Sequence, residues 1–249
     1  MPLLEKLRQN TCLGIFSKTT DSSMVEAAGF GGLDFIILDL EHGPISTETL
    51  VHHIRAARLT PMAPIVRVKG VDPHAIGAVL DSGAEGVQVP NINTPEQAEA
   101  AVKAARFYPS GCRGVCRFVR AAAYGSQKKQ DYFQGANEKL VILQVEGMAG
   151  VRNLDAILDV PGFDVLFVGP YDLSQSVGKP GEVDSPAVLS LMAEIAAKAR
   201  NKGILLGAFC DTQNNAELLK KQGFTYIAYS VDMNIYLEAC RAVKQLLDT

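Results

Sequence analysis

The chain has no tryptophan, few histidines and no long apolar run. The lack of a long apolar run argues against a membrane protein. Only four histidines occur in 249 residues. No apolar stretch reaches the roughly 20 residues that a membrane-spanning helix needs. The first residues are mixed in charge and lack the apolar core of a signal peptide. We therefore expect a soluble, cytoplasmic protein without a membrane partner.

Clusters of basic residues and an ordered set of cysteines are also missing. The net charge is −3, with acidic and basic residues interspersed, so a nucleic-acid partner is not expected. The five cysteines are scattered and odd in number, which argues against a disulfide framework. Cys112 and Cys116 lack the second pair or nearby histidine that a zinc site would need. Reduced cysteines are expected.

Short runs rich in Val, Ile and Leu alternate with amphipathic stretches along the whole chain. Such runs are typical of strands that are buried on both faces of a parallel sheet. The predicted strands are 12–16, 35–39, 64–68, 86–90, 141–146, 164–168, 204–209 and 226–230. This repeat of strand and helix predicts an α/β fold, a (β/α)₈ TIM barrel that spans 1–249 as one domain. An open doubly wound sheet is the alternative, weakened because no Gly-x-Gly-x-x-Gly follows the first strand.

Helix signals fill the segments between the predicted strands. Ser, Thr or Asp caps, several followed by Pro at the first helical position, open most of these segments. The predicted helices are 47–59, 73–82, 95–107, 186–201 and 212–222. The segment 108–137 is the least regular, and we predict a long loop there with a functional role.

Two carboxylates at the ends of predicted strands are the strongest functional signal. Glu146 closes the fifth strand, and Asp172 follows the sixth across an expected turn, 169–171. In a barrel of this kind the active site lies at the carboxyl ends of the strands. A buried carboxylate is costly unless it is paired or bound to a metal. The two acids therefore predict a divalent cation held by oxygen ligands.

Further reactive groups are expected at the same rim. Arg67 offers a planar fork for a substrate carboxylate, and His42 can take and return a proton near neutral pH. Asp39 or another acid can orient that imidazole. Taken singly, each group also has a structural explanation, such as a salt bridge, a turn or, for Asp172, the cap of a helix at 173–177. Their shared position favours a catalytic set.

Several motifs, in order along the chain, resemble the HpcH/HpaI aldolase family. They are Leu-Asp-Leu-Glu-His-Gly-Pro at 38–44, Arg67, Gly-Ala-Glu-Gly-Val-Gln-Val-Pro at 83–90, Gln-Val-Glu at 144–146 and Val-Gly-Pro-Tyr-Asp-Leu-Ser at 168–174. The resemblance implies a metal-dependent class II pyruvate aldolase on a (β/α)₈ barrel. Its substrates would be a 4-hydroxy-2-oxo acid or, in reverse, pyruvate and an aldehyde.

The resemblance also implies roles for single residues. Glu146 and Asp172 match the ligands of a divalent metal such as Mg²⁺, Mn²⁺ or Co²⁺. Arg67 matches the residue that binds pyruvate and its enolate. His42 matches the catalytic base and Asp39 its orienting partner.

The remaining residues that match the family concern substrate and assembly. Gln144 matches a polar residue near the keto acid, and the backbone at Gly169 and Pro170 would lie along the pyruvate carboxylate. Asp81 matches an acid that reaches the site from a neighbouring subunit. Relatives are commonly hexamers with exchanged C-terminal helices, which makes 234–247 a candidate interface element.

Two departures from the family leave the aldehyde open. Gly-Met-Ala follows Glu146 where many members have Thr or Ser, and the loop 116–125 differs in its polar and aromatic content. An acyl-CoA carbon–carbon lyase like citrate lyase is an alternative, disfavoured because no basic patch for the CoA phosphate is evident. A non-catalytic keto-acid-binding barrel is the other. Lys69 is the nearest candidate for a Schiff-base lysine, which the metal mechanism does not require.

Overall fold

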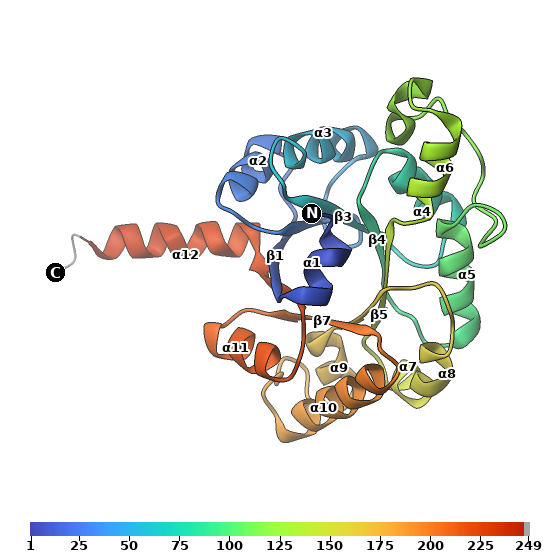
Figure 1. The fold of residues 1–249 in the computed structure, drawn as a ribbon. Helices are drawn as coiled ribbons and strands as arrows, with labels where there is room; N and C mark the ends of the chain where they lie inside the picture. Colours follow the sequence, from blue (N-terminus) through green and yellow to red (C-terminus); the bar gives the residue numbers. More distant parts are fainter. Residues whose placement is uncertain (247–249) are drawn as a thin grey trace.

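The computed structural model describes residues 1–246 and contains a closed barrel of eight parallel strands in sequence order (Figure 1). The predicted (β/α)₈ architecture is therefore confirmed. Most strand boundaries differ from prediction by one residue at an end. The strands are β1 (Cys12–Ser17), β2 (Phe35–Asp39), β3 (Ala63–Arg67), β4 (Gly86–Val89), β5 (Leu140–Val145), β6 (Val165–Val168), β7 (Leu205–Cys210) and β8 (Tyr226–Val231).

The interior of the barrel is filled by alternate strand residues, because successive side chains point to opposite faces. The rings of Phe35 and Tyr226 stack there with centroids 4.0 Å apart. Gly207 leaves space for the Tyr226 ring, since a Cβ at this position would lie 2.8 Å from it. A second, larger cluster joins the outward side chains to the helices. The barrel is thus a packed core that leaves no pore.

The last inward-facing layer is polar. Asp39 of β2 is in register with Arg67 of β3, and Arg67 is in register with Gln88 of β4. Gln144 of β5 lies two residues beyond Ile142, the register partner of Gln88, and its side chain accepts a hydrogen bond from Gln88. The other end is closed by α1 (Leu3–Gln9), whose Leu3 and Leu7 join the inner apolar cluster. Polar chemistry is therefore confined to the carboxyl end of the barrel.

The helices that follow the strands begin largely where the caps predict. Asp72 and Thr94 accept backbone N–H groups at their helix starts, and Thr94 forms a full capping box with Gln97. The helices after α1 are α2 (Ser22–Phe30), α3 (Thr47–Ala57), α4 (Pro73–Asp81), α5 (Pro95–Ala105), α6 (Lys129–Ala136), α7 (Met148–Arg152), α8 (Leu154–Leu158), α9 (Pro170–Ser176), α10 (Pro186–Asn201), α11 (Gln213–Lys221) and α12 (Asp232–Gln245).

Two local predictions were wrong. The segment 108–137 is not one irregular loop, because it contains the 3₁₀ helix η1 (Arg120–Gly125) and α6. Tyr132 of α6 packs its ring against Phe107, which gives this segment a small core of its own. The expected turn at 169–171 is instead the start of α9, whose first residue is Pro170. Proline suits that position because its missing N–H would be unpaired there anyway.

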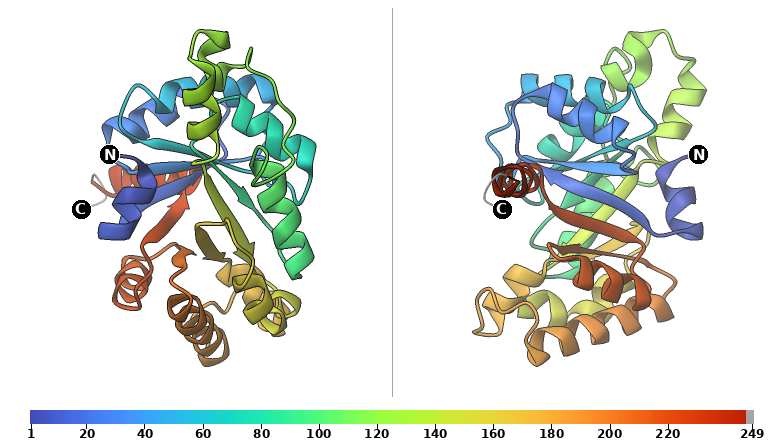
Figure 2. Two further views of the ribbon diagram at one scale, coloured as in Figure 1. Left: turned by 45° about the vertical axis from the view of Figure 1, so that its right-hand side comes forward. Right: turned by 90° about the vertical axis from the view of Figure 1, so that its left-hand side faces the viewer.

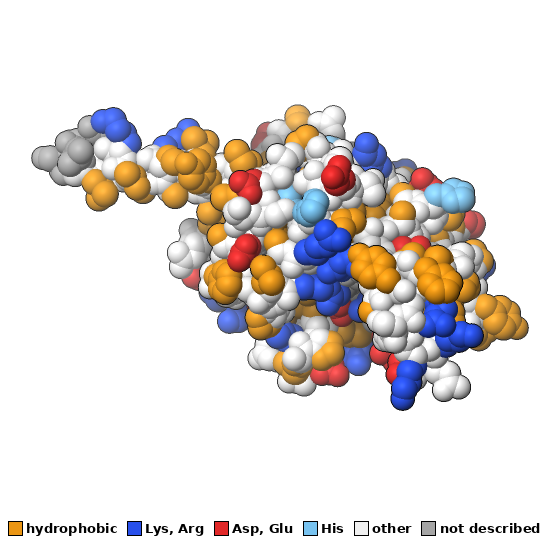
Figure 3. Space-filling view, turned by 90° about the horizontal axis from the view of Figure 1, so that it is seen from above, with side chains coloured by type: hydrophobic (Ala, Val, Ile, Leu, Met, Phe, Trp, Pro, Cys, Tyr) orange, Lys and Arg blue, Asp and Glu red, His pale blue; other side chains and the backbone are white. Residues whose placement is uncertain are grey.

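Helix α12 leaves the barrel and projects from it (Figure 1). It begins at the carboxyl end of β8, and the views in Figure 2 place it at the opposite end of the barrel from α1. Apolar side chains gather along it (Figure 3), including Tyr236, which is 58% exposed. The predicted interface element 234–247 overlaps α12, and residue 247 lies outside the described residues. Within 1–246, no helix is long and apolar enough to cross a membrane.

Candidate active site

A cavity of about 220 Å³ opens at the carboxyl ends of the strands. Six of the predicted site residues line it, from four different strand exits. They are His42, Arg67, Gln144, Gly169, Pro170 and Asp172. Strands β2, β3, β5 and β6 bring these residues together from distant parts of the sequence. Apolar rings, including Phe16 and Phe167, form part of the wall.

A buried ion pair holds Arg67 in place. Its Nε and Nη2 donate to the two carboxylate oxygens of Asp39 at 2.9 and 2.8 Å, and its Nη1 lies 3.1 Å from Glu41. Burial by itself would raise the pKa of Asp39, but the hydrogen bonds and charge of Arg67 outweigh it and hold this pKa below its usual range. The guanidinium also lies over the Phe16 ring, 4.7 Å from its centroid. Arg67 therefore presents a fixed positive fork to the cavity.

His42 stands at the mouth of the cavity, with its side chain largely exposed. Asp39 accepts a hydrogen bond from the backbone N–H of His42, at 3.3 Å. Among the described residues, no hydrogen bond joins the Asp39 carboxylate to the imidazole. The acid nearest the ring is Glu41, 3.8 Å from Nε2. Asp39 thus supports the loop that carries His42, whereas orientation of the ring would fall to Glu41.

A chain of amides supports Glu146. The side-chain amide of Gln88 donates to Gln144 at 2.6 Å, and that of Gln144 donates to Glu146. The other Glu146 oxygen accepts the backbone N–H of Asn91 at 2.9 Å. Burial raises the pKa of Glu146 to about 7, and the nearby charges of Asp172 and Glu41 add to this rise. Glu146 is therefore an acid that its surroundings keep from ionising easily.

Gly169 leaves room for the Glu146 carboxylate. A Cβ at this position would lie 2.7 Å from Oε2 of Glu146 and 3.0 Å from its Cβ. Any larger residue would displace the carboxylate that Gln144 orients. The sequence pattern identified Gly169 through its backbone, and the structure adds this steric reason for a glycine.

The acids at this rim suit a divalent cation. Asp172 lies in the first turn of α9, which has no side-chain cap, so the helix-cap alternative for this residue does not apply. Its charge acts on both Glu146 and Glu41, and a bound cation would relieve that repulsion. In residues 1–246, no group of three His, Cys, Asp or Glu side chains could hold a metal. Two carboxylates with coordination positions left for substrate and water are the usual arrangement for Mg²⁺.

The sequence interpretation missed Lys18 at this rim and gave no role to Glu41 and Asn91, which it placed there. It also named Asp81, which does not line the cavity. Lys18 lines the cavity, Glu41 pairs with Arg67, and Asn91 contacts Glu146. Lys18 directly follows β1, so the rule that was applied to the other strand ends would have found it. Asp81, at the end of α4, pairs with Arg113 instead of lining this cavity. Its approach to a neighbouring subunit's site stays a prediction.

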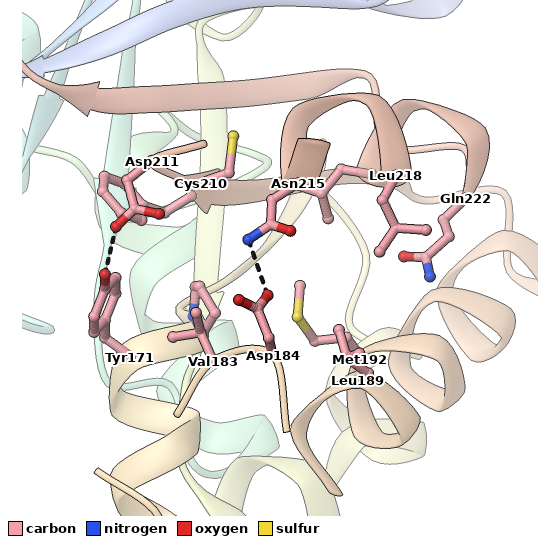
Figure 4. A pocket seen from close by; sticks show the side chains of 13 residues that line it. Tyr171, Val183, Asp184, Leu189, Met192, Cys210, Asp211, Asn215, Leu218 and Gln222 are labelled. Carbon is pink, nitrogen blue, oxygen red and sulfur yellow. Dashed lines mark hydrogen bonds between the residues drawn. The ribbon is translucent and has the colours of Figure 1, made fainter. Parts of the chain in front are cut away.

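A smaller cavity lies behind one wall of the site (Figure 4). Tyr171 and Phe209 belong to both cavities, and the Tyr171 hydroxyl donates to Asp211. That hydrogen bond, with burial, raises the pKa of Tyr171 to about 12, so the phenol stays protonated. Asn215 donates to Asp184 at 3.0 Å across this second cavity. Its volume of about 30 Å³ admits one or two waters, which makes it a packing gap.

Known proteins are similar to this chain in sequence and fold. The family model described as HpcH/HpaI aldolase/citrate lyase matches residues 12–239. The chain belongs to this family. It is 36% identical to 2-dehydro-3,6-dideoxy-6-sulfogluconate aldolase of Pseudomonas putida, over 91% of this chain and 88% of the relative. It is also 36% identical to 2-keto-3-deoxy-L-rhamnonate aldolase of Klebsiella pneumoniae, over 94% and 87%.

A solved structure of the same family agrees in fold. It is an HpcH/HpaI aldolase/citrate lyase family protein from Burkholderia cenocepacia, with 35% sequence identity and a TM-score of 0.93. The match covers 99% of each chain. The two relatives named above are aldolases, which supports a carbon–carbon lyase activity for this HpcH/HpaI chain.

The raised pKa of Glu146 predicts a specific dependence of stability on pH. The folded metal-free protein binds this proton up to about pH 7, whereas the ordinary value is 4.5. The free energy of unfolding should therefore fall as pH rises from 4.5 to 7, by about 3 kcal/mol in total. Glu146→Gln, which cannot ionise, should be more stable than the parent at pH 8 and nearly equal to it at pH 4.5.

Urea unfolding of both proteins at the two pH values, in EDTA and at one protein concentration, measures this difference. Glu99→Gln is the control, because it removes an exposed carboxylate whose ion pair within the described residues is with Lys103. It should change stability by less than about 0.5 kcal/mol. A Glu146→Gln protein less stable than the parent at pH 8 would contradict the prediction.

Proposed function

We propose that this protein is a class II pyruvate aldolase that reversibly cleaves a 4-hydroxy-2-oxo acid to pyruvate and an aldehyde. The observation that carries the proposal is that the fixed Arg67 fork and Asp172 line one cavity, with the buried acid Glu146 beside Gly169 of its wall. The named aldolase activities of the relatives support the same reaction class.

The carboxylate and the keto oxygen of the 2-oxo acid would each contact groups of the cavity that suit their negative charge. Glu146 and Asp172 would hold a divalent cation, Mg²⁺, Mn²⁺ or Co²⁺, which supplies Lewis-acid stabilisation of negative charge when bound. The substrate carboxylate would lie along the backbone at Gly169 and Pro170, which line the cavity. Arg67 faces the keto oxygen, where charge develops, and Gln144 supports Glu146 from below.

The cleavage steps follow from these positions. His42 takes the proton from the 4-hydroxyl group, the C3–C4 bond breaks, and the aldehyde leaves. The electron pair of that bond forms the enolate of pyruvate, whose oxygen Arg67 stabilises. Return of a proton to C3 gives pyruvate. Because Asp39 and Glu41 hold the guanidinium rigidly, this stabilisation requires little reorganisation.

Pyruvate release should depend on a divalent metal. A panel of 4-hydroxy-2-oxo acids, assayed with EDTA and again after Mg²⁺ or Mn²⁺ is restored, should show cleavage that is lost and regained. Cleavage that survives EDTA would point to a lysine mechanism instead. No cleavage of any substrate, and no decarboxylation of oxaloacetate, would favour an acyl-CoA lyase or a non-catalytic binding protein.

Arg67→Lys should lower turnover while leaving the fold intact. The lysine keeps a positive charge near buried Asp39 but lacks the planar fork, so pyruvate release should fall about 10- to 100-fold or more. Arg106→Lys is the matched control, since Arg106 is equally buried and binds the Lys139 and Gly162 carbonyls away from the cavity. It should cost stability without a comparable loss of turnover. Equal turnover in both variants would remove Arg67 from the mechanism.

We also propose that α12 packs on a neighbouring subunit in a homo-oligomer, a hexamer by the resemblance to the family. Its exposed apolar side chains, including Ile235, Tyr236 and Val243, have little to cover them within the chain. A projecting apolar helix of this kind would otherwise favour aggregation. If each subunit packed its α12 against a neighbouring subunit, the apolar side chains of this helix would be buried without any change in the fold of the barrel.

Charges placed on α12 should dissociate the oligomer. Ile235→Asp with Val243→Asp should shift the mass measured by light scattering toward the monomer, because the acids would be buried in the interface. Ala193→Asp with Ala197→Asp, on the exposed face of α10, is the control and should leave the mass unchanged. A parent protein that is already monomeric, or an unchanged mass in the α12 variant, would reject this interface.

A further inference from the structure

Lys18 places a second cation in the cavity, across the barrel mouth from the predicted metal ligands. Its side chain, which is 34% exposed, follows β1 and lines the cavity. In the closed strand order β1 lies four strands away from β5, whose exit carries Glu146. A substrate that is held at Glu146 would therefore extend its other end toward the side where Lys18 stands.

The backbone around Lys18 is held by two buried side chains from other elements. Asp232, the first residue of α12, accepts the Ser17 hydroxyl at 2.8 Å and the N–H groups of Lys18 and Thr19 at 3.0 Å. His53 of α3 bonds the Thr19 carbonyl at 2.9 Å through Nε2. A lysine that served only solubility would not need this support. The segment 17–19 is thus pre-organised in the way that binding groups require.

The ammonium of Lys18 has donor capacity that the protein does not use. Its nearest acid is Asp39, at 3.9 Å. The Asp39 carboxylate already accepts two hydrogen bonds from Arg67 and two from the backbone N–H groups of Glu41 and His42. Within the described residues the ammonium makes no hydrogen bond, although it carries three donors. A ligand oxyanion would satisfy them and offset their partial desolvation.

We propose that Lys18 recognises a terminal carboxylate on the aldehyde-derived end of the substrate, so that the enzyme prefers 4-hydroxy-2-oxo diacids. This inference rests on the proposed aldolase function, which assigns the 2-oxo carboxylate to the opposite side of the cavity. Apolar side chains on strands between β5 and β1, including Phe209 of β7 and Val231 of β8, line the cavity and suit the intervening carbon chain. Lys18 would then determine specificity and take no part in bond cleavage.

Binding of 2-oxo acids that lack the 4-hydroxyl group, and so cannot be cleaved, tests the proposal directly. Calorimetry on the Mn²⁺-loaded protein measures the dissociation constants of a diacid and of the monoacid of equal length. The three pairs are 2-oxoglutarate with 2-oxopentanoate, 2-oxoadipate with 2-oxohexanoate, and 2-oxopimelate with 2-oxoheptanoate. At one length or more, the parent should bind the diacid about 10- to 100-fold more tightly. Lys18→Met should abolish this preference, Lys18→Arg should retain part of it, and Lys69→Met should leave it intact. Lys69 is a suitable control because it follows β3, at the same end of the barrel, is exposed and does not line the cavity.

Exchange of the methyl protons of pyruvate with D₂O separates this proposal from the proposed function, because it needs only the enolate chemistry. Lys18→Met should exchange at a rate within about threefold of the parent. A diacid preference that is absent in the parent, or that survives in Lys18→Met, overturns the proposal. Equal weakening of both acids together with lost exchange also overturns it, since Lys18 would then serve the 2-oxo end. A parent that prefers diacids but does not exchange pyruvate protons would reject the aldolase and retain the role of Lys18.

Discussion

The buried pair of Asp39 and Arg67 is the interaction on which the rest of the site depends. The two residues are register partners at the last inward position of adjacent strands, so the sheet itself sets their distance. Loss of either would leave an uncompensated charge below the cavity, at a cost of about 3–5 kcal/mol. Asp39 also accepts two backbone N–H groups of the loop with Glu41 and His42. One carboxylate therefore positions both the cationic fork and the proposed base.

The acidic charge of Glu146 and Glu41 at the rim of the barrel lowers the stability of the metal-free protein. Burial and mutual repulsion raise the pKa of Glu146 and of Glu41, so the metal-free fold ionises them at a cost. Among residues 1–246, the hydrogen bonds that stabilise the Glu146 charge come from the Gln144 amide and the Asn91 N–H. Sites that must bind a cation commonly carry such a cost, because the energy is recovered when the ligand arrives.

Asp232 contributes both to the start of helix α12 and to the cavity wall at Lys18. It begins the projecting helix α12, and its carboxylate fixes the segment that carries Lys18. The proposed subunit contact and the proposed specificity group thus share one buried residue.

The sequence by itself determined the barrel, the strand order and the side of the barrel that carries chemistry. Apolar runs buried on two faces and capped helices such as that after Thr94 are local signals, and parallel strands direct their carboxyl ends to one rim. The motifs also identified the family. What the tertiary structure decided was pairing, namely that Asp39 holds Arg67 instead of the His42 ring, and that Lys18 enters the cavity. It also decided the helix at 129–136, whose aromatic contacts come from another segment. These facts depend on distances between residues that are remote in sequence, which no local pattern encodes.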